Sequence, residues 1–210
     1  MAAVDSMGLA RAERTDLAAF LEKLRPEQWE EPSLCAGWTV RDLVAHVYSL
    51  EGVGAVGLVR RFVAGRLRLD RINEVGRAPL ADATPDDLVE LAHRWVQPRG
   101  LTAAFHGRIA LLDALIHQQD VRRPLDLPRV IPTDRLRCAI DFATWAPPIG
   151  ARPRIHGLTL TATDLDWATG HGPLVEGTGE ALLLAMAGRA AVLPELSGPG
   201  AAVLASRVSG

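Results

Sequence analysis

The sequence lacks any apolar run that approaches the ~20 residues needed by a membrane-spanning helix. Its first stretch, MAAVDSMGLARAERTDL, is interrupted by charged residues too often to be a signal peptide. We therefore expect a cytoplasmic protein with no membrane partner.

The sequence also lacks a basic footprint. Its formal net charge is -2, its isoelectric point is about 6.3, and Lys23 is the only lysine. No block of Lys and Arg residues is interleaved with aromatic residues in the way that nucleic-acid-binding proteins show. A nucleic-acid partner is therefore not expected.

Cysteine is scarce, because Cys35 and Cys138 are the two cysteines and they form no C-x-x-C motif. In a reducing compartment we expect free thiols, with a disulfide as the less favoured alternative. Cys35 is predicted to be a buried structural thiol rather than a redox-active one.

The sequence does contain enough apolar residues for a core, since 48% of its 210 residues are hydrophobic. Apolar residues recur at helical spacing, with N-cap signals at Thr39 and at Thr84. Glycines within residues 52–57 are places where the second helix could bend or break. The predicted helices span residues 9–24, 39–65, 84–96, 102–122 and 133–145.

The segment APPIGARPR, residues 146–154, breaks the helical pattern and is a candidate linker. Beyond it, apolar residues alternate with threonine over residues 158–163, which is the period of a half-buried strand. DWATGHGPLVEG predicts a hairpin turn with a return strand, and Thr178 caps a last helix. The predicted fold is mainly α, with a four- to five-helix bundle over residues 1–146 and a small α+β domain over residues 147–210.

An ionisable stripe lies within the stretch LLDALIHQQDV, residues 111–121. At about 100° per residue, Asp113, His117 and Asp120 fall within roughly 60° of one another on a helix. Apolar residues flank them on that side, and Gln118 and Gln119 are predicted to point away from it. Burying an unpaired carboxylate costs several kcal/mol, so these groups need a charged partner, a hydrogen-bond network or a metal ion.

His46 shares a face with apolar residues of the second predicted helix and therefore also points toward the core. Two imidazoles and a carboxylate on facing helices, with one position open, suit a catalytic divalent metal such as zinc. Asp120 is then a fourth ligand or an acceptor that orients an imidazole N–H. The alternative is that His46 and His117 are core histidines hydrogen-bonded to Asp113 and Asp120 without a metal, and periodicity alone leaves both open.

Three segments carry a further signal: RAERTDLAAFLEKLRPEQWEEPSLCAGWTVRDLVAHV, ALLDALIHQQDVRRPL and LTATDLDWATGHGPLVEGTGEALLLAMAGR. Together they resemble the mycothiol-dependent maleylpyruvate isomerase-like family, a branch of the DinB-like metal-binding bundles. The resemblance spans nearly the whole chain, and its most specific part is the block C-x-G-W-T-V-R-D-x-x-A-H over residues 35–46.

The resemblance implies a metal site made by His46, Asp113 and His117. The acid is Asp here where the characterised isomerase has Glu, so its reach is one methylene shorter. The resemblance also places Trp38 near the site. It implies a divalent metal, usually zinc, that binds mycothiol as a thiolate for addition or transfer to an electrophile.

The leading hypothesis is therefore a metal- and mycothiol-dependent S-transferase or isomerase that acts on a small electrophile. Asp120 assists as an acceptor or a general base, and Trp38 contacts the thiol cofactor. The rival hypothesis is a non-catalytic bundle that binds a metal or another ligand. The identity of the electrophile, the role of the C-terminal unit and the oligomeric state, including a homodimer, stay open.

Overall fold

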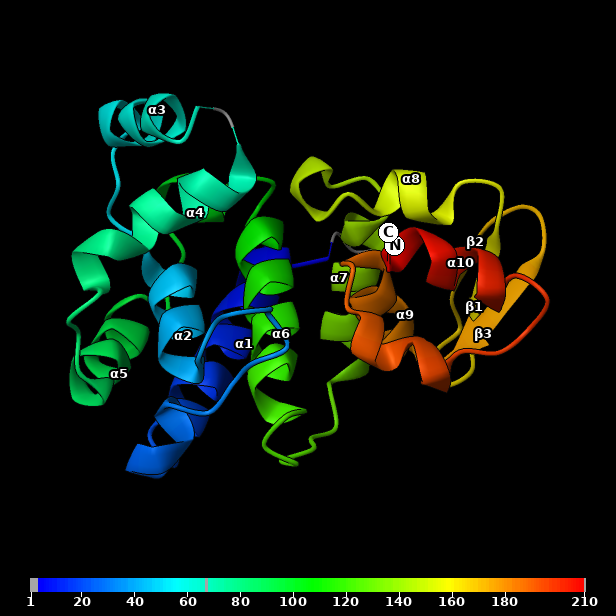
Figure 1. Ribbon diagram of the computed structural model, residues 1–210, viewed down its shortest axis with the longest axis horizontal. Coiled ribbons are helices and arrows are strands. Elements are labelled where there is room, and N and C mark those ends of the chain that lie inside the picture. The colour runs from blue at the N-terminus through cyan, green and yellow to red at the C-terminus, as the bar shows by residue number, and fades with distance from the viewer. Residues whose placement is uncertain (1–3, 67, 210) are drawn as a thin grey trace. The chain divides into compact units, whose positions relative to one another are not determined.

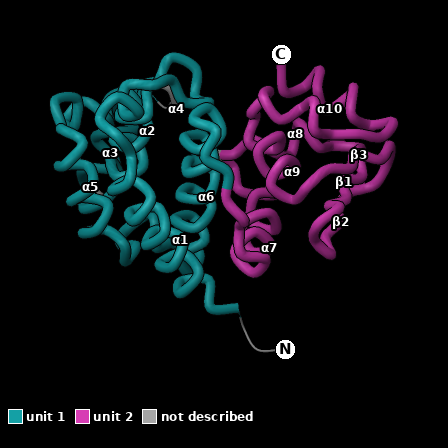
Figure 2. The backbone as a smooth tube through the Cα atoms, turned by 90° about the horizontal axis from the view of Figure 1, so that it is seen from below, with its two compact units in different colours: residues 1–128 teal, residues 129–210 magenta. Residues whose placement is uncertain are grey.

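The computed structural model describes residues 4–66 and 68–209, which divide into two compact units, Met1–Pro128 and Arg129–Gly210 (Figure 2). This boundary precedes the predicted one after residue 146. The difference is helix α7 (Thr133–Ala143), which packs against α9 (Gly179–Met186) of the second unit and so lies outside the bundle. That the two units are separate folding domains stays a prediction.

The first unit is a bundle in which α1 and α6 lie side by side and α2 packs against both α6 and α5 (Figure 1). Its helices are α1 (Ser6–Leu21), α2 (Val40–Tyr48), α3 (Ala55–Ala64), α4 (Leu69–Arg77), α5 (Pro85–Arg94) and α6 (Arg108–Arg122). The mainly helical fold class predicted from the sequence is confirmed. Within the described residues, no helix is both long and apolar enough to span a membrane.

The predicted helix over residues 39–65 is two helices, because the chain turns between α2 and α3. Gly52 has a φ of 71°, a left-handed backbone that ends the helical path at low cost only for glycine. Helix α4 was not predicted because its sequence LDRINEVGR is short and mostly polar, although Leu69, Ile72 and Val75 recur at helical spacing.

Three helices start after the predicted capping residues Thr39, Thr84 and, for α9, Thr178. The Thr39 hydroxyl accepts a hydrogen bond from the Asp42 backbone N–H at 3.2 Å, and Thr84 does the same for Asp87 at 3.2 Å. Helix α6 starts later than predicted, at Arg108, because Gly107 has a left-handed φ of 83°.

The second unit contains a three-stranded sheet with the order β2-β1-β3. β1 (Thr159–Ala162) pairs antiparallel with β2 (Ala168–Gly170) and parallel with β3 (Leu174–Gly177). The predicted alternation holds in β1, where Leu160 is fully buried and Thr159 and Thr161 are half-buried. The predicted single return strand is instead two short strands on either side of β1. The remaining helices are α8 (Ala151–Ile155) and α10 (Ala201–Val208).

A buried ion pair joins α1 to the chain just after α2. Arg14 Nη2 lies 2.6 Å from Glu51 Oε1, and both side chains have no exposed surface. Arg14 Nη1 also donates to the Trp95 carbonyl at 2.8 Å. Because neither charge can reach water, each depends on the other for compensation.

We expect Arg14→Met to destabilise the fold by about 3–5 kcal/mol, because Glu51 is then left buried without its cation. The double variant Arg14→Met/Glu51→Leu should recover most of that loss. Urea unfolding followed by circular dichroism measures both. The exposed Arg94–Glu90 pair supplies the control variant, Arg94→Met, which should change stability little. An Arg14→Met variant as stable as Arg94→Met contradicts the prediction.

Candidate functional site

Helix α6 carries the predicted stripe toward the inside of the bundle. The side chains of Asp113, His117 and Asp120 are 28%, 12% and 0% exposed. His117 Nε2 lies 3.5 Å from Asp113 Oδ1, and His117 Nδ1 lies 2.9 Å from Asp120 Oδ2. The two ring nitrogens therefore face two different carboxylates.

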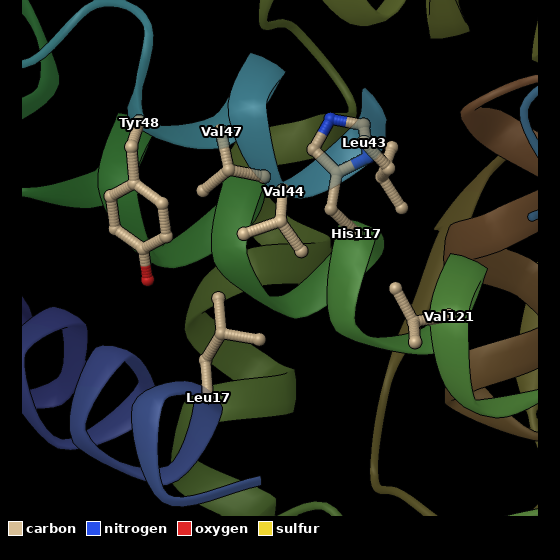
Figure 3. Close-up of a pocket in the computed structure, with 7 residues that line it drawn as sticks. All are labelled: Leu17, Leu43, Val44, Val47, Tyr48, His117 and Val121. Atoms are coloured by element: carbon tan, nitrogen blue, oxygen red, sulfur yellow. The ribbon is translucent and has the colours of Figure 1, made fainter. Parts of the chain in front are cut away.

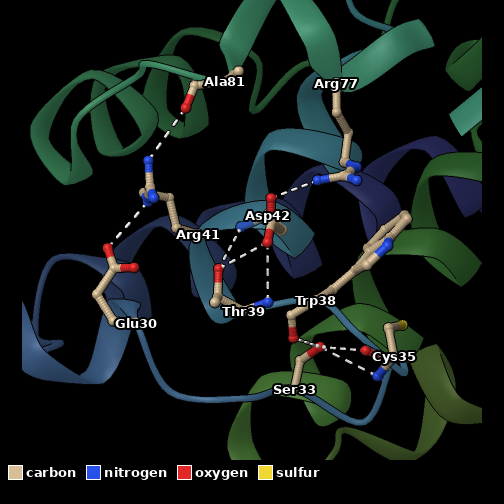
Figure 4. A network of polar contacts seen from close by, with 9 residues as sticks. All are labelled: Glu30, Ser33, Cys35, Trp38, Thr39, Arg41, Asp42, Arg77 and Ala81. Atoms are coloured by element: carbon tan, nitrogen blue, oxygen red, sulfur yellow. Dashed lines mark hydrogen bonds and ion pairs between the residues drawn. The ribbon is translucent and has the colours of Figure 1, made fainter. Parts of the chain in front are cut away.

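Helix α2 brings the second imidazole. Its N-terminus is fixed by the Thr39 cap, and the Asp42 carboxylate accepts the Thr39 backbone N–H in return at 3.2 Å (Figure 4). His46 lies one turn further along, with its ring centroid 5.2 Å from that of His117 in an edge-to-face arrangement. The capped helix thus directs His46 at α6.

His46, Asp113 and His117 can each offer one ligand atom such that the three atoms lie within 4.8 Å of one another. Donors that share a zinc ion at about 2.0–2.2 Å lie roughly 3.5 Å apart, so small side-chain rotations suffice to close this set. A second group, made of Cys35, His117 and Asp120, meets the same criterion. His117 is the member common to both groups.

Trp38 lies against His46, with ring centroids 5.0 Å apart. The guanidinium of Arg77 lies 4.5 Å from the centre of the Trp38 ring, and its Nη1 is 2.5 Å from Asp42 Oδ1 (Figure 4). The cation, the indole and the two imidazoles therefore follow one another toward the centre of the bundle. Arg77 comes from helix α4, which was not predicted, so this residue was missed.

Below His117, the packing is apolar and tight (Figure 3). The gaps between the side chains there are too narrow for a water molecule. Their lining comes from α1, α2 and α6: Leu17, Leu43, Val44, Val47, Tyr48, His117 and Val121. Burial raises the pKa of the Tyr48 phenol above its usual range. This floor keeps water away from the buried side of His117.

The pKa of His117 responds to burial and to the carboxylates in opposite directions. Burial alone lowers it, but the charge of Asp113 and the hydrogen bonds with Asp120 and Cys35 outweigh burial and raise the pKa from 6.5 to about 10. In the metal-free protein the imidazole is therefore a cation held by acids. The same carboxylates would also favour a metal cation bound to His117 in place of the extra proton on its ring.

Two predictions about side-chain placement were wrong. Gln118 and Gln119 were expected to point away from the core, yet they are 0% and 2% exposed. Helix α6 contacts α1 and α2, so more than one of its faces is buried, and Gln118 Nε2 donates to the Asp16 carbonyl of α1 at 3.4 Å. Cys35 was expected to be buried, but it is half-buried and lies at the site itself.

The fold and the site together define a helical-bundle protein whose interior carries a cluster of histidine and aspartate side chains that could ligate a metal. Residues 10–99 match the family described as the mycothiol maleylpyruvate isomerase N-terminal domain. This match confirms, for that part of the chain, the resemblance inferred from the sequence. The matched region contains His46 but ends before Asp113 and His117.

Two similar solved structures extend the comparison to most of the chain. One is the mycothiol-dependent maleylpyruvate isomerase, with a TM-score of 0.56 and 19% sequence identity. The other is a histidine-to-alanine variant of that isomerase, with a TM-score of 0.59 and 17% sequence identity. Each comparison covers 93% of this chain and 92% of the other chain. At these identities the likeness establishes the fold. No curated protein gives a significant match.

The raised pKa of His117 predicts that the metal-free protein loses stability in alkali. The pKa of about 10 in the folded state lies above the usual 6.5, so the stabilisation is fully present below pH 6.5 and is lost as pH rises through 10. Urea unfolding of chelator-treated protein should show the decrease, and His117→Gln should flatten it. Parallel pH profiles for the two proteins would contradict the assignment.

Proposed function

We propose that this protein is a metal- and mycothiol-dependent enzyme that isomerises a small electrophile or transfers a thiol to it. The observation that carries the proposal is the convergence of His46 from α2 with Asp113 and His117 from α6. The solved isomerases of the same fold are mycothiol-dependent and act on maleylpyruvate, which makes a related small electrophile the favoured substrate class.

The donor set fits a divalent metal. Two imidazole nitrogens and one carboxylate oxygen are a ligand combination of catalytic zinc sites, which keep a further position for a substrate or water. The shorter Asp113 side chain still brings its oxygen 3.5 Å from His117 Nε2, so it reaches the cluster. When bound, the metal lowers the pKa of a coordinated thiol, which supports mycothiol as the nucleophile.

Asp120 supports this site through His117. Its carboxylate is fully buried and accepts the Nδ1–H of His117 at 2.9 Å. With that proton held on Nδ1, Nε2 is the nitrogen that would give up its proton and ligate a metal beside Asp113. Because Asp120 has no exposed surface, the role that we propose is acceptor and orienting group. The alternative role as a general base would need contact with the substrate.

Trp38 and Arg77 supply the other part of the site. Trp38 lies 5.0 Å from the His46 ring, so we propose that the thiol cofactor contacts the indole when its sulfur is next to the imidazoles. The Arg77 cation over the indole face places positive charge beside that position. Because Asp42 already pairs with the guanidinium, the contact with Arg77 chiefly holds the indole in place.

Metal analysis tests the ligand set. Protein purified without a metal-affinity step should contain about one divalent metal per chain, because three ligands converge at one point. His46→Ala and His117→Ala should lose the metal. His93→Ala is the matched control, since His93 is about half exposed and pairs with Glu22 on the surface. Full metal content in His117→Ala rules out the ligand set.

Turnover is tested separately, with mycothiol and a panel of small electrophiles that includes maleylpyruvate. Asp113→Asn should lower kcat/KM by about 100-fold or more, because it removes an anionic ligand of the metal. Loss of a group that only orients a ligand usually has a smaller effect. Asp86→Asn, on the exposed start of α5, is the control. A metal-loaded protein that is inactive across the panel supports the rival hypothesis of a non-catalytic binding protein.

A further inference from the structure

The loop over residues 33–38 connects two parts of the site. Hydrogen bonds within the loop hold its shape (Figure 4): Ser33 N and Oγ both donate to the Trp38 carbonyl at 2.9 Å, and Trp38 N donates to the Cys35 carbonyl at 3.0 Å. The Cys35 backbone N–H donates to Ser33 Oγ at 3.2 Å. With its backbone fixed in this way, the loop presents Cys35 and Trp38 in defined positions.

Two further contacts attach this loop to the end of α6, and both reach Asp120. The Leu34 backbone N–H donates to the Asp120 carbonyl at 3.0 Å. Cys35 Sγ lies 3.4 Å from Asp120 Oδ2, with the thiol as the donor. The same Oδ2 atom accepts the Nδ1–H of His117 at 2.9 Å. One carboxylate oxygen therefore links the loop to the imidazole.

This arrangement restricts both the carboxylate and the ring. Asp120 is fully buried, so water cannot replace a donor that is lost. With the thiol and the imidazole N–H on one oxygen, rotation of the Asp120 carboxylate would break both bonds. Holding the carboxylate fixes the His117 ring, and fixing the ring directs Nε2 toward Asp113.

We propose that Cys35 is a positioning residue for the metal site, whose thiol holds Asp120 in place and thereby orients His117. The inference rests on the proposed function, because it concerns the affinity of the His46, Asp113 and His117 site for its metal. Cys35 acts from the Nδ1 side of the imidazole, whereas Asp113 lies on the Nε2 side. The thiol therefore stands behind the ring and outside the ligand set.

Cobalt(II) binding tests this role, since cobalt occupies zinc sites and its absorption reports its ligands. The variants are Cys35→Ala, which removes the donor, and Cys35→Ser, which keeps a hydroxyl donor. Cys138→Ala is the control, because Cys138 is buried in the second unit. Affinity is measured by competition with a chelator, and circular dichroism with thermal melting verifies that each variant is folded.

We expect Cys35→Ala to bind cobalt about 10–100-fold more weakly than the wild type, which is the usual effect of losing a group that orients a ligand. Cys35→Ser should recover much of the affinity, and Cys138→Ala should equal the wild type. The wild-type cobalt spectrum should contain no thiolate-to-cobalt charge-transfer band, because the sulfur is not a ligand. Should Cys35→Ala misfold, the spectrum and the affinity of Cys35→Ser decide the matter.

Three results overturn the inference. Unchanged cobalt affinity in a folded Cys35→Ala protein shows that the thiol positions nothing. A charge-transfer band that Cys35→Ala or Cys35→Ser abolishes shows that the sulfur is itself a ligand, together with His117 and Asp120. A wild-type chain that binds neither cobalt nor zinc overturns the proposed function as well. In the first two results the wild type still binds the metal, so they overturn only the role of Cys35.

Discussion

The structure depends on the need to compensate ionisable groups that α6 carries into the interior. Asp120 is fully buried and His117 nearly so, and a buried charge is tolerated only beside a partner. In the metal-free state the imidazolium of His117 compensates Asp113 and Asp120, and its raised pKa expresses this. The segments that pack against α6 hold these ionisable groups close to one another.

Those neighbours approach from two directions. Helix α2, started by its Thr39 cap, brings His46 close to His117 and Asp113. The loop over residues 33–38 brings the Cys35 thiol to Asp120 on the Nδ1 side. The imidazole therefore has Asp113 beside Nε2 and the hydrogen-bonded Asp120 beside Nδ1. The proposed metal would bind on the side of the ring that faces Asp113, whereas Asp120 and the Cys35 thiol hold the other side.

Local patterns in the sequence were sufficient to predict much of the site. The i, i+4, i+7 spacing placed Asp113, His117 and Asp120 on one face, and the capping residue predicted where α2 begins. Patterns were insufficient where a helix has several buried faces or few apolar residues. Gln118 and Gln119 are buried because α6 has more than one neighbour, and α4, with its Arg77, was missed because its sequence is mostly polar.

The sequence by itself determined that α6 is a helix with an acidic and histidine-containing buried stripe, and that His46 points inward from another helix. Both predictions follow from the geometry of a single helix, which places residues three or four positions apart on the same face. Only the tertiary structure decided which groups meet: His46 with His117, Cys35 with Asp120, and Arg77 with Trp38. Periodicity specifies a face but not the partner opposite it, because that partner is selected by packing between segments far apart in the chain.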